Sequence, residues 1–259
     1  MAQTFSRPIQ LALEHERWLR WAVVLFPLLA VAMIAFFKLF PRLYAFLIAE
    51  DRLVEWGTAI AYLVAAGFAV SLALHFRRQQ EWIYIPLYGV LAAGMFVIAM
   101  EEISWAQRQF GIETPPTIAA LNYKDELNIH NMGVRSWVHW AFIVVAFYGA
   151  FSRLMATPWL IKHFPKLVDL VTPPYVLFLF FFVPFLYYVY LDFFWSEEHY
   201  ITGKDQEPIE LLLALGFLLF AVFNWVRYRV GAPLTFEGTG GAGLPASDGR
   251  ISAKKPVAF

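Results

Sequence analysis

The stretch from Val54 to His75 reads VEWGTAIAYLVAAGFAVSLALH and decides the class of fold. Between Glu55 and His75 it has no charged side chain. A helix of about 20 apolar residues spans the roughly 30 Å hydrocarbon core of a bilayer, so we expect this stretch to cross a membrane. Small residues recur at every fourth position and predict a face on which another helix packs closely. They are Gly57, Ala61, Ala65 and Ala69.

Five further apolar stretches flank this one. The expected spans cover residues 21–37, 54–75, 83–104, 136–152, 174–195 and 209–226. The first is expected to be a retained anchor, because no small-residue cleavage site follows it. Hydrophobic residues make up 60% of the 259 residues and charged ones only 15%, against about 45–50% and 25% in soluble domains. We therefore predict an all-α membrane protein, a six-helix transmembrane bundle over residues 21–230, preceded by a cytoplasmic segment 1–20 and followed by a disordered cytoplasmic tail 231–259.

The distribution of charge predicts the orientation of the bundle. Most of the 20 Lys and Arg residues lie on the side of the two termini, and most of the 20 acidic residues lie on the other side. Basic residues accumulate in cytoplasmic loops, so both termini are expected in the cytoplasm. The longest outer loop, residues 107–135 between the third and fourth helices, is expected to be structured. We expect a multi-pass membrane protein.

Composition also excludes several classes of function. The chain contains no Cys, which excludes disulfides, thiol nucleophiles and thiolate metal sites. Equal numbers of acidic and basic residues argue against a nucleic-acid partner. No HExxH motif occurs, so a divalent metal would need carboxylates together with His130, His139 or His199. The cofactor therefore stays undetermined, and we predict no metal ligand.

The third span ends in EEISWAQR, from Glu101 to Arg108. This span runs outward, so its acidic end is a helix C-terminus, where negative charge is disfavoured. Glu101 and Glu102 should therefore require compensating partners. If the helix continues, Ser104 and Arg108 share a face with Glu101. By contrast, the dipole at the start of a span is sufficient to explain Glu55 and Glu210.

These considerations predict a polar cluster at the outer membrane surface. One of the two glutamates would accept a proton, a His would be a second acid–base group or ligand, and an Arg would clamp an anion. The candidate catalytic residues are Glu101, Glu102, His130 and His139. The candidate substrate-binding residues are Gln107, Arg108, Asp125, Asn128, Asn131 and Arg135.

The same region carries a resemblance to known proteins. The run Glu101–Arg108, then FGIETP at Phe110–Pro115 and NIHN at Asn128–Asn131, resembles an uncharacterised group of bacterial multi-pass membrane proteins. Those proteins commonly read E-E-I-S-W-G-Q-R, F-G-x-E-T-P and N-x-H-N, and here Ala106 replaces the Gly. The resemblance implies an inner-membrane protein with its marked residues in the outer region, and it implies no activity.

A fainter similarity is to VanZ-like proteins, which pair an acidic helix end with a later Arg and Asp-x-x-Asn. The residues that could be aligned are Glu102, Gln107, Arg108, Asp125 and Asn128.

Three functions are compatible with these features. In the leading hypothesis the polar cluster binds and processes an amphipathic or lipid-linked substrate. In the second, the protein is a non-catalytic subunit or assembly factor whose partner is another membrane protein. The third is a small transporter, against which the position of the cluster near one membrane surface argues. All three have membrane lipids as partners, and whether the protein is an enzyme stays open.

Overall fold

The computed structural model is built of helices and describes residues 16–49, 52–122, 126–129, 135–195 and 205–230. No strand occurs among these residues. Five helical segments are long and apolar enough to cross a membrane, which confirms the expected all-α, multi-pass class. The first expected span falls on a shorter apolar helix, Trp21–Phe37. The terminal segments 1–15 and 231–259 lie outside the described residues.

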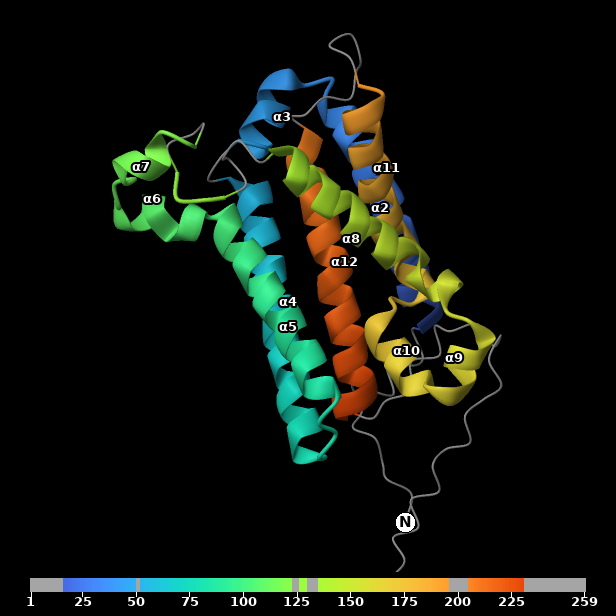
Figure 1. The fold of residues 1–259 in the computed structure, drawn as a ribbon. Helices are drawn as coiled ribbons and strands as arrows, with labels where there is room; N and C mark the ends of the chain where they lie inside the picture. The colour runs from blue at the N-terminus through green and yellow to red at the C-terminus, as the bar shows by residue number, and fades with distance from the viewer. Residues whose placement is uncertain (1–15, 50–51, 123–125, 130–134, 196–204, 231–259) are drawn as a thin grey trace, which may run out of the picture.

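The helices follow one another in the order shown in Figure 1. They are α2 (Glu16–Phe37), α3 (Pro41–Leu47), α4 (Leu53–Arg78), α5 (Tyr84–Glu102), η1 (Ser104–Ala106), α6 (Gln107–Phe110), α7 (Pro116–Ala119), α8 (Arg135–Met155), α9 (Pro158–His163), α10 (Pro165–Val171), η2 (Tyr175–Leu177), α11 (Phe178–Phe193), α12 (Gln206–Trp225) and the π-helical turn η4 (Val226–Val230).

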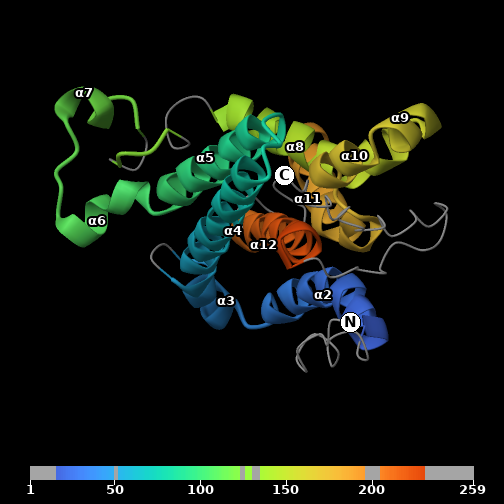
Figure 2. The same cartoon turned by 90° about the horizontal axis from the view of Figure 1, so that it is seen from below.

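Helix α12 lies in the centre of the bundle, with α4, α11 and α2 around it (Figure 2). Ala214 and Ala221 on one side of α12 pack with Ala61 and Ala65 of α4. The predicted small-residue ridge is confirmed as a packing face, since Ala65 and Ala69 are completely buried. Small side chains let the helix backbones approach closely, and α12 can therefore sit between its neighbours.

The other side of α12 meets an aromatic wall. Leu212, Leu213 and Phe220 form one buried cluster with Phe180 and Phe181 of α11. The aromatic run of the fifth span thus contributes to the bundle core. Large apolar side chains also cover the outside of the bundle, as expected for helices whose solvent is lipid.

The two ends of the bundle differ. One end, here named the loop end, carries α3, α6 and α7, and the opposite end carries α9, α10 and the α4–α5 turn (Figure 1). At the opposite end Asp169 pairs with Arg153 and Arg227, each at 3.1 Å. Both ion pairs tie the α9–α10 segment to the helical bundle.

The third expected span is shorter than predicted. Helix α5 ends at Glu102, and Ser104, Trp105 and Ala106 have φ values of 47°, 55° and 59°. Left-handed backbone breaks the helix, so the expectation that Arg108 stacks above Glu101 on a continuing helix is wrong. Instead the chain leaves the bundle through η1 into α6 and α7.

Candidate functional site

Three carboxylates meet at the loop end of the bundle. They belong to Glu102, the last residue of α5, and to Glu207 and Glu210 in the first turns of α12. One oxygen from each lies within 4.8 Å of the others. Glu210 is buried, and the other two side chains are half-buried. We name this group the carboxylate cluster.

Helix geometry explains why these residues meet. Glu207 and Glu210 are three positions apart, so they share a face of α12. Helix α5 ends where α12 begins, so Glu102 faces a helix N-terminus, whose dipole favours negative charge. Two carboxylates already stand at this end of α12, so the three acids also repel one another.

Two tyrosines border the cluster. The Tyr188 hydroxyl of α11 donates a hydrogen bond to Glu210 Oε1 at 2.6 Å, and Gln206 Nε2 donates to the same oxygen at 2.6 Å. Tyr62 of α4 is only 1% exposed, and its hydroxyl has no hydrogen-bond partner among the described residues. Tyr62 belongs to one buried cluster with Ala99 of α5 and Ala214 of α12, which lie about one helical turn from Glu102 and Glu210. The cluster therefore has a donor on one side and an unpartnered hydroxyl on another.

A histidine–aspartate pair adjoins the cluster through Tyr188. Nδ1 of the buried His139 lies 2.6 Å from Oδ1 of Asp192, and the His139 ring centroid lies 5.4 Å from that of Tyr188. A carboxylate that orients an imidazole in this way is a common arrangement for general acid–base chemistry. The contacts run from Asp192 through His139 and Tyr188 to Glu210.

Glu101 has a different surrounding from Glu102. Its Oε1 accepts a hydrogen bond from Trp105 Nε1 at 2.7 Å, and its Oε2 accepts one from the backbone N–H of Ile129 at 2.6 Å. Successive helix residues point about 100° apart, so the two neighbouring glutamates face different groups. Glu101 joins the end of α5 to the far end of the outer loop.

A buried network holds the described part of this loop. Asn128 Nδ2 donates to Ser104 Oγ at 2.9 Å and to Glu126 Oε2 at 2.6 Å, and Asn122 Nδ2 donates to the Asn128 carbonyl at 2.8 Å. Gln107 Oε1 accepts from the backbone N–H of Leu127 at 2.6 Å. The expected structured loop thus has a physical basis in these hydrogen bonds.

Arg108 connects the loop to the bundle. Its Nη2 lies 3.0 Å from Glu55 Oε1 and 3.6 Å from Glu126 Oε1. Gln107, Arg108 and Asn128, predicted to bind substrate, therefore bind groups of the protein itself. Their predicted contacts with a substrate stay predictions.

Several predicted site residues cannot be placed. Asp125, His130 and Asn131 lie outside the described residues, and so does the side chain of Arg135. Of the predicted residues that are described, Glu102 belongs to the carboxylate cluster and His139 adjoins the cluster through Tyr188. Glu101, Gln107, Arg108 and Asn128 gather around the loop. The predicted single cluster is two neighbouring groups.

Sequence reasoning missed Glu207 and both tyrosines, and it attributed Glu210 to the dipole of its own helix. The signal that could have found the pair is the run QEPIE from Gln206 to Glu210, which places two acids on one face at the same end as Glu102.

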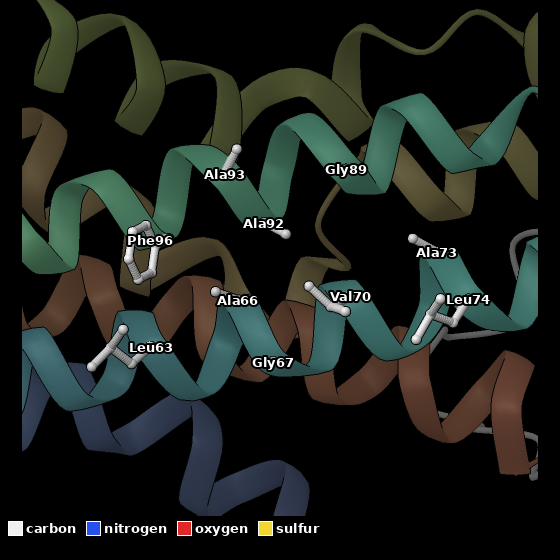
Figure 3. A pocket seen from close by; sticks show the side chains of 10 residues that line it. All are labelled: Leu63, Ala66, Gly67, Val70, Ala73, Leu74, Gly89, Ala92, Ala93 and Phe96. Atoms are coloured by element: carbon white, nitrogen blue, oxygen red, sulfur yellow. The ribbon is translucent and has the colours of Figure 1, made fainter.

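An apolar groove lies along the outside of α4 and α5 (Figure 3). It has a volume of about 530 Å³, and Leu63 and Phe96 line one end while Leu74 lines the other. On α4 it extends for about 16 Å at 1.5 Å per residue, and Phe96 lies about 9 Å along α5 from Glu102. The groove thus approaches the loop end from within the apolar zone.

No family model matches the chain, and neither a curated protein nor a solved structure shows significant similarity to it. The resemblances of the Glu101–Arg108 region therefore remain at the level of the quoted motifs, and the function is argued from the geometry of the site.

Proposed function

We propose that the protein is a six-span protein of a bacterial inner membrane, with both termini in the cytoplasm, that binds and processes an amphipathic or lipid-linked substrate at its loop end. In this proposal α2, the first helix along the chain, crosses the membrane in addition to the five longer segments, and the loop end faces the periplasm. The excess of basic residues on the side of the termini supports this orientation.

The observation that carries the proposal is the carboxylate cluster beside the His139–Asp192 pair. Polar groups at membrane depth are costly and are found chiefly where a function requires them. Glu102 would accept a proton from the substrate or from water, and His139, oriented by Asp192, would be the second acid–base group. Glu101 and Arg108 would hold the loop that borders this site.

The groove on α4 and α5 supports an amphipathic substrate. It is lined by apolar and small residues, among them Ala66, Gly67 and Gly89. An acyl chain of about a dozen carbons matches a length of about 16 Å. A substrate whose chain lies there would have its polar part near the loop end, where Glu102 lies.

The test is complementation of a gene deletion in the host cell. Glu102→Gln keeps the size of the side chain and removes its charge and its basicity, so we expect it to abolish complementation while the protein still accumulates in the membrane. His139→Gln should reduce complementation strongly. Glu113→Gln, a substitution of the same kind at an exposed loop position, is the matched control and should complement fully.

Full complementation by Glu102→Gln would contradict a function through the carboxylate cluster. The role of a non-catalytic subunit bound to another membrane protein would then replace the proposal. A stoichiometric partner should in that case co-purify with the full chain in mild detergent.

A further inference from the structure

We infer that the carboxylate cluster, together with the Tyr62 hydroxyl, is a binding site for a hard divalent cation such as Mn²⁺, Ca²⁺ or Mg²⁺. This cation site goes beyond the proposed function, because side chains of the protein form it and no substrate takes part.

The distance between the carboxylates suits a single ion. Two ligands on opposite sides of one ion are separated by twice the metal–oxygen distance, which is about 4.2 Å for Mg²⁺ and about 4.6–5.2 Å for Ca²⁺. One carboxylate oxygen from each of Glu102, Glu207 and Glu210 lies within 4.8 Å of the other two. They can therefore contact one ion with only small side-chain movements.

The buried hydroxyl of Tyr62 has no hydrogen-bond partner among the described residues. A buried hydroxyl without a hydrogen bond is destabilising, yet this one lies in a side chain only 1% exposed. Side chains on a helix lean toward its N-terminus, and α4 begins at the loop end, so Tyr62 leans toward the cluster. Tyr62 also belongs to one buried cluster with Ala99 of α5 and Ala214 of α12, which lie about one helical turn from Glu102 and Glu210. A cation, or a water molecule bound to it, gives the Tyr62 oxygen a partner.

The ligand chemistry also suits a hard cation. All four groups offer oxygen, which is the preferred ligand atom of Ca²⁺, Mg²⁺ and Mn²⁺. Tyr188 and Gln206 donate hydrogen bonds to Glu210 and would orient it, as outer partners orient metal-binding carboxylates. The cation also offsets the mutual repulsion of three carboxylates in a half-buried setting.

The experiment is a titration of the purified full chain in detergent with Mn²⁺, in which electron paramagnetic resonance measures the free ion. We expect a single saturable site per chain that Ca²⁺ or Mg²⁺ displaces. Glu102→Gln and Glu210→Gln should each weaken Mn²⁺ binding by at least about tenfold, and Tyr62→Phe by about tenfold. Glu113→Gln is the matched control, because Glu113 is exposed in the outer loop, and it should bind Mn²⁺ as the wild type does.

The inference is overturned if the wild type binds no Mn²⁺ up to about 1 mM, the weak limit of extracellular Ca²⁺ sites, or if Glu102→Gln retains wild-type affinity. If the glutamine variants do not yield folded protein by gel filtration, Tyr62→Phe decides, since it removes one oxygen that makes no hydrogen bond. Unchanged Mn²⁺ affinity in Tyr62→Phe would then overturn the inference. Failure here is distinct from failure of the proposed function, because the titration contains no substrate and complementation measures no cation.

Discussion

Glu101 and Glu102 are neighbours in the chain, but their carboxylates contact different groups. Glu101 accepts hydrogen bonds from Trp105 and from the backbone of Ile129, so it fastens the outer loop. Glu102 turns toward α12 and joins two further carboxylates. The sequence indicates that both need partners, because both stand at the C-terminal end of a helix. It does not indicate which partner belongs to which residue, since that depends on a rotation of about 100°.

Ala106 illustrates how a single residue can conflict with the local backbone. It has φ 59°, a left-handed conformation that is unfavourable by about 1–2 kcal/mol for residues with a Cβ. The resembling motif has Gly at this place, and Gly adopts that conformation without strain.

We predict that Ala106→Gly stabilises the start of the loop by about 0.5–1 kcal/mol. Hydrogen exchange measured by mass spectrometry should show slower exchange over residues 104–112 than in the wild type. Ala120→Gly is the control, because Ala120 has φ −65° in the right-handed region. That substitution gains no relief of strain and should leave exchange equal or faster. Faster exchange in Ala106→Gly would show that the backbone of Ala106 is not strained in solution.

At the scale of elements, the spans could be predicted and the cluster could not. Hydropathy along one chain segment is sufficient to find a membrane helix, and the five longer spans lie close to their expected places. The cluster joins Glu102 to Glu207 and Glu210, which are more distant in sequence than any local pattern reaches. Because an acid at a helix N-terminus has an ordinary local explanation, Glu210 gave no reason to expect a partner on α5.

The crossing of α8 and α11 depends on one small residue. A Cβ on Gly149 of α8 would lie 2.1 Å from Cδ1 of Phe181, whose side chain is completely buried. A contact below 3.0 Å forces a movement, and a packed aromatic ring has no free space to move into.

Gly149→Ala should therefore lower stability by about 1–3 kcal/mol, even though Ala favours helix formation over Gly. Thermal unfolding in detergent, followed by tryptophan fluorescence, should show a lower midpoint. Gly94→Ala on α5 is the matched control, since nothing lies within 4 Å of its added Cβ, and its midpoint should be unchanged or higher. The double variant Gly149→Ala with Phe181→Leu should recover part of the loss. Equal midpoints for the two alanine variants would contradict this packing of α8 on α11.

Helix α12 connects the structural core with the candidate site. Its middle packs against small residues of α4 and aromatic residues of α11. Its first turns carry two of the three clustered carboxylates. A close-packed central helix holds these acids at fixed positions, which is the preorganisation that a binding site needs. The loop end is therefore the functional end in our proposal, which requires that this end faces the periplasm.

The absence of Cys from the chain makes the orientation directly measurable, because each introduced Cys is the only thiol. We expect Gln109→Cys at the exposed loop end to react with a membrane-impermeant maleimide in cells whose outer membrane is permeabilised and whose inner membrane is intact. Gln79→Cys, exposed in the α4–α5 turn at the opposite end, should react only after the inner membrane is disrupted.

Leu39→Cys, 70% exposed after α2, should behave like Gln109→Cys, whereas Ser6→Cys should behave like Gln79→Cys. Equal labelling of Ser6→Cys and Leu39→Cys in intact cells would mean that α2 does not cross the membrane. Reversed labelling of Gln109→Cys and Gln79→Cys would place the carboxylate cluster at the cytoplasmic surface.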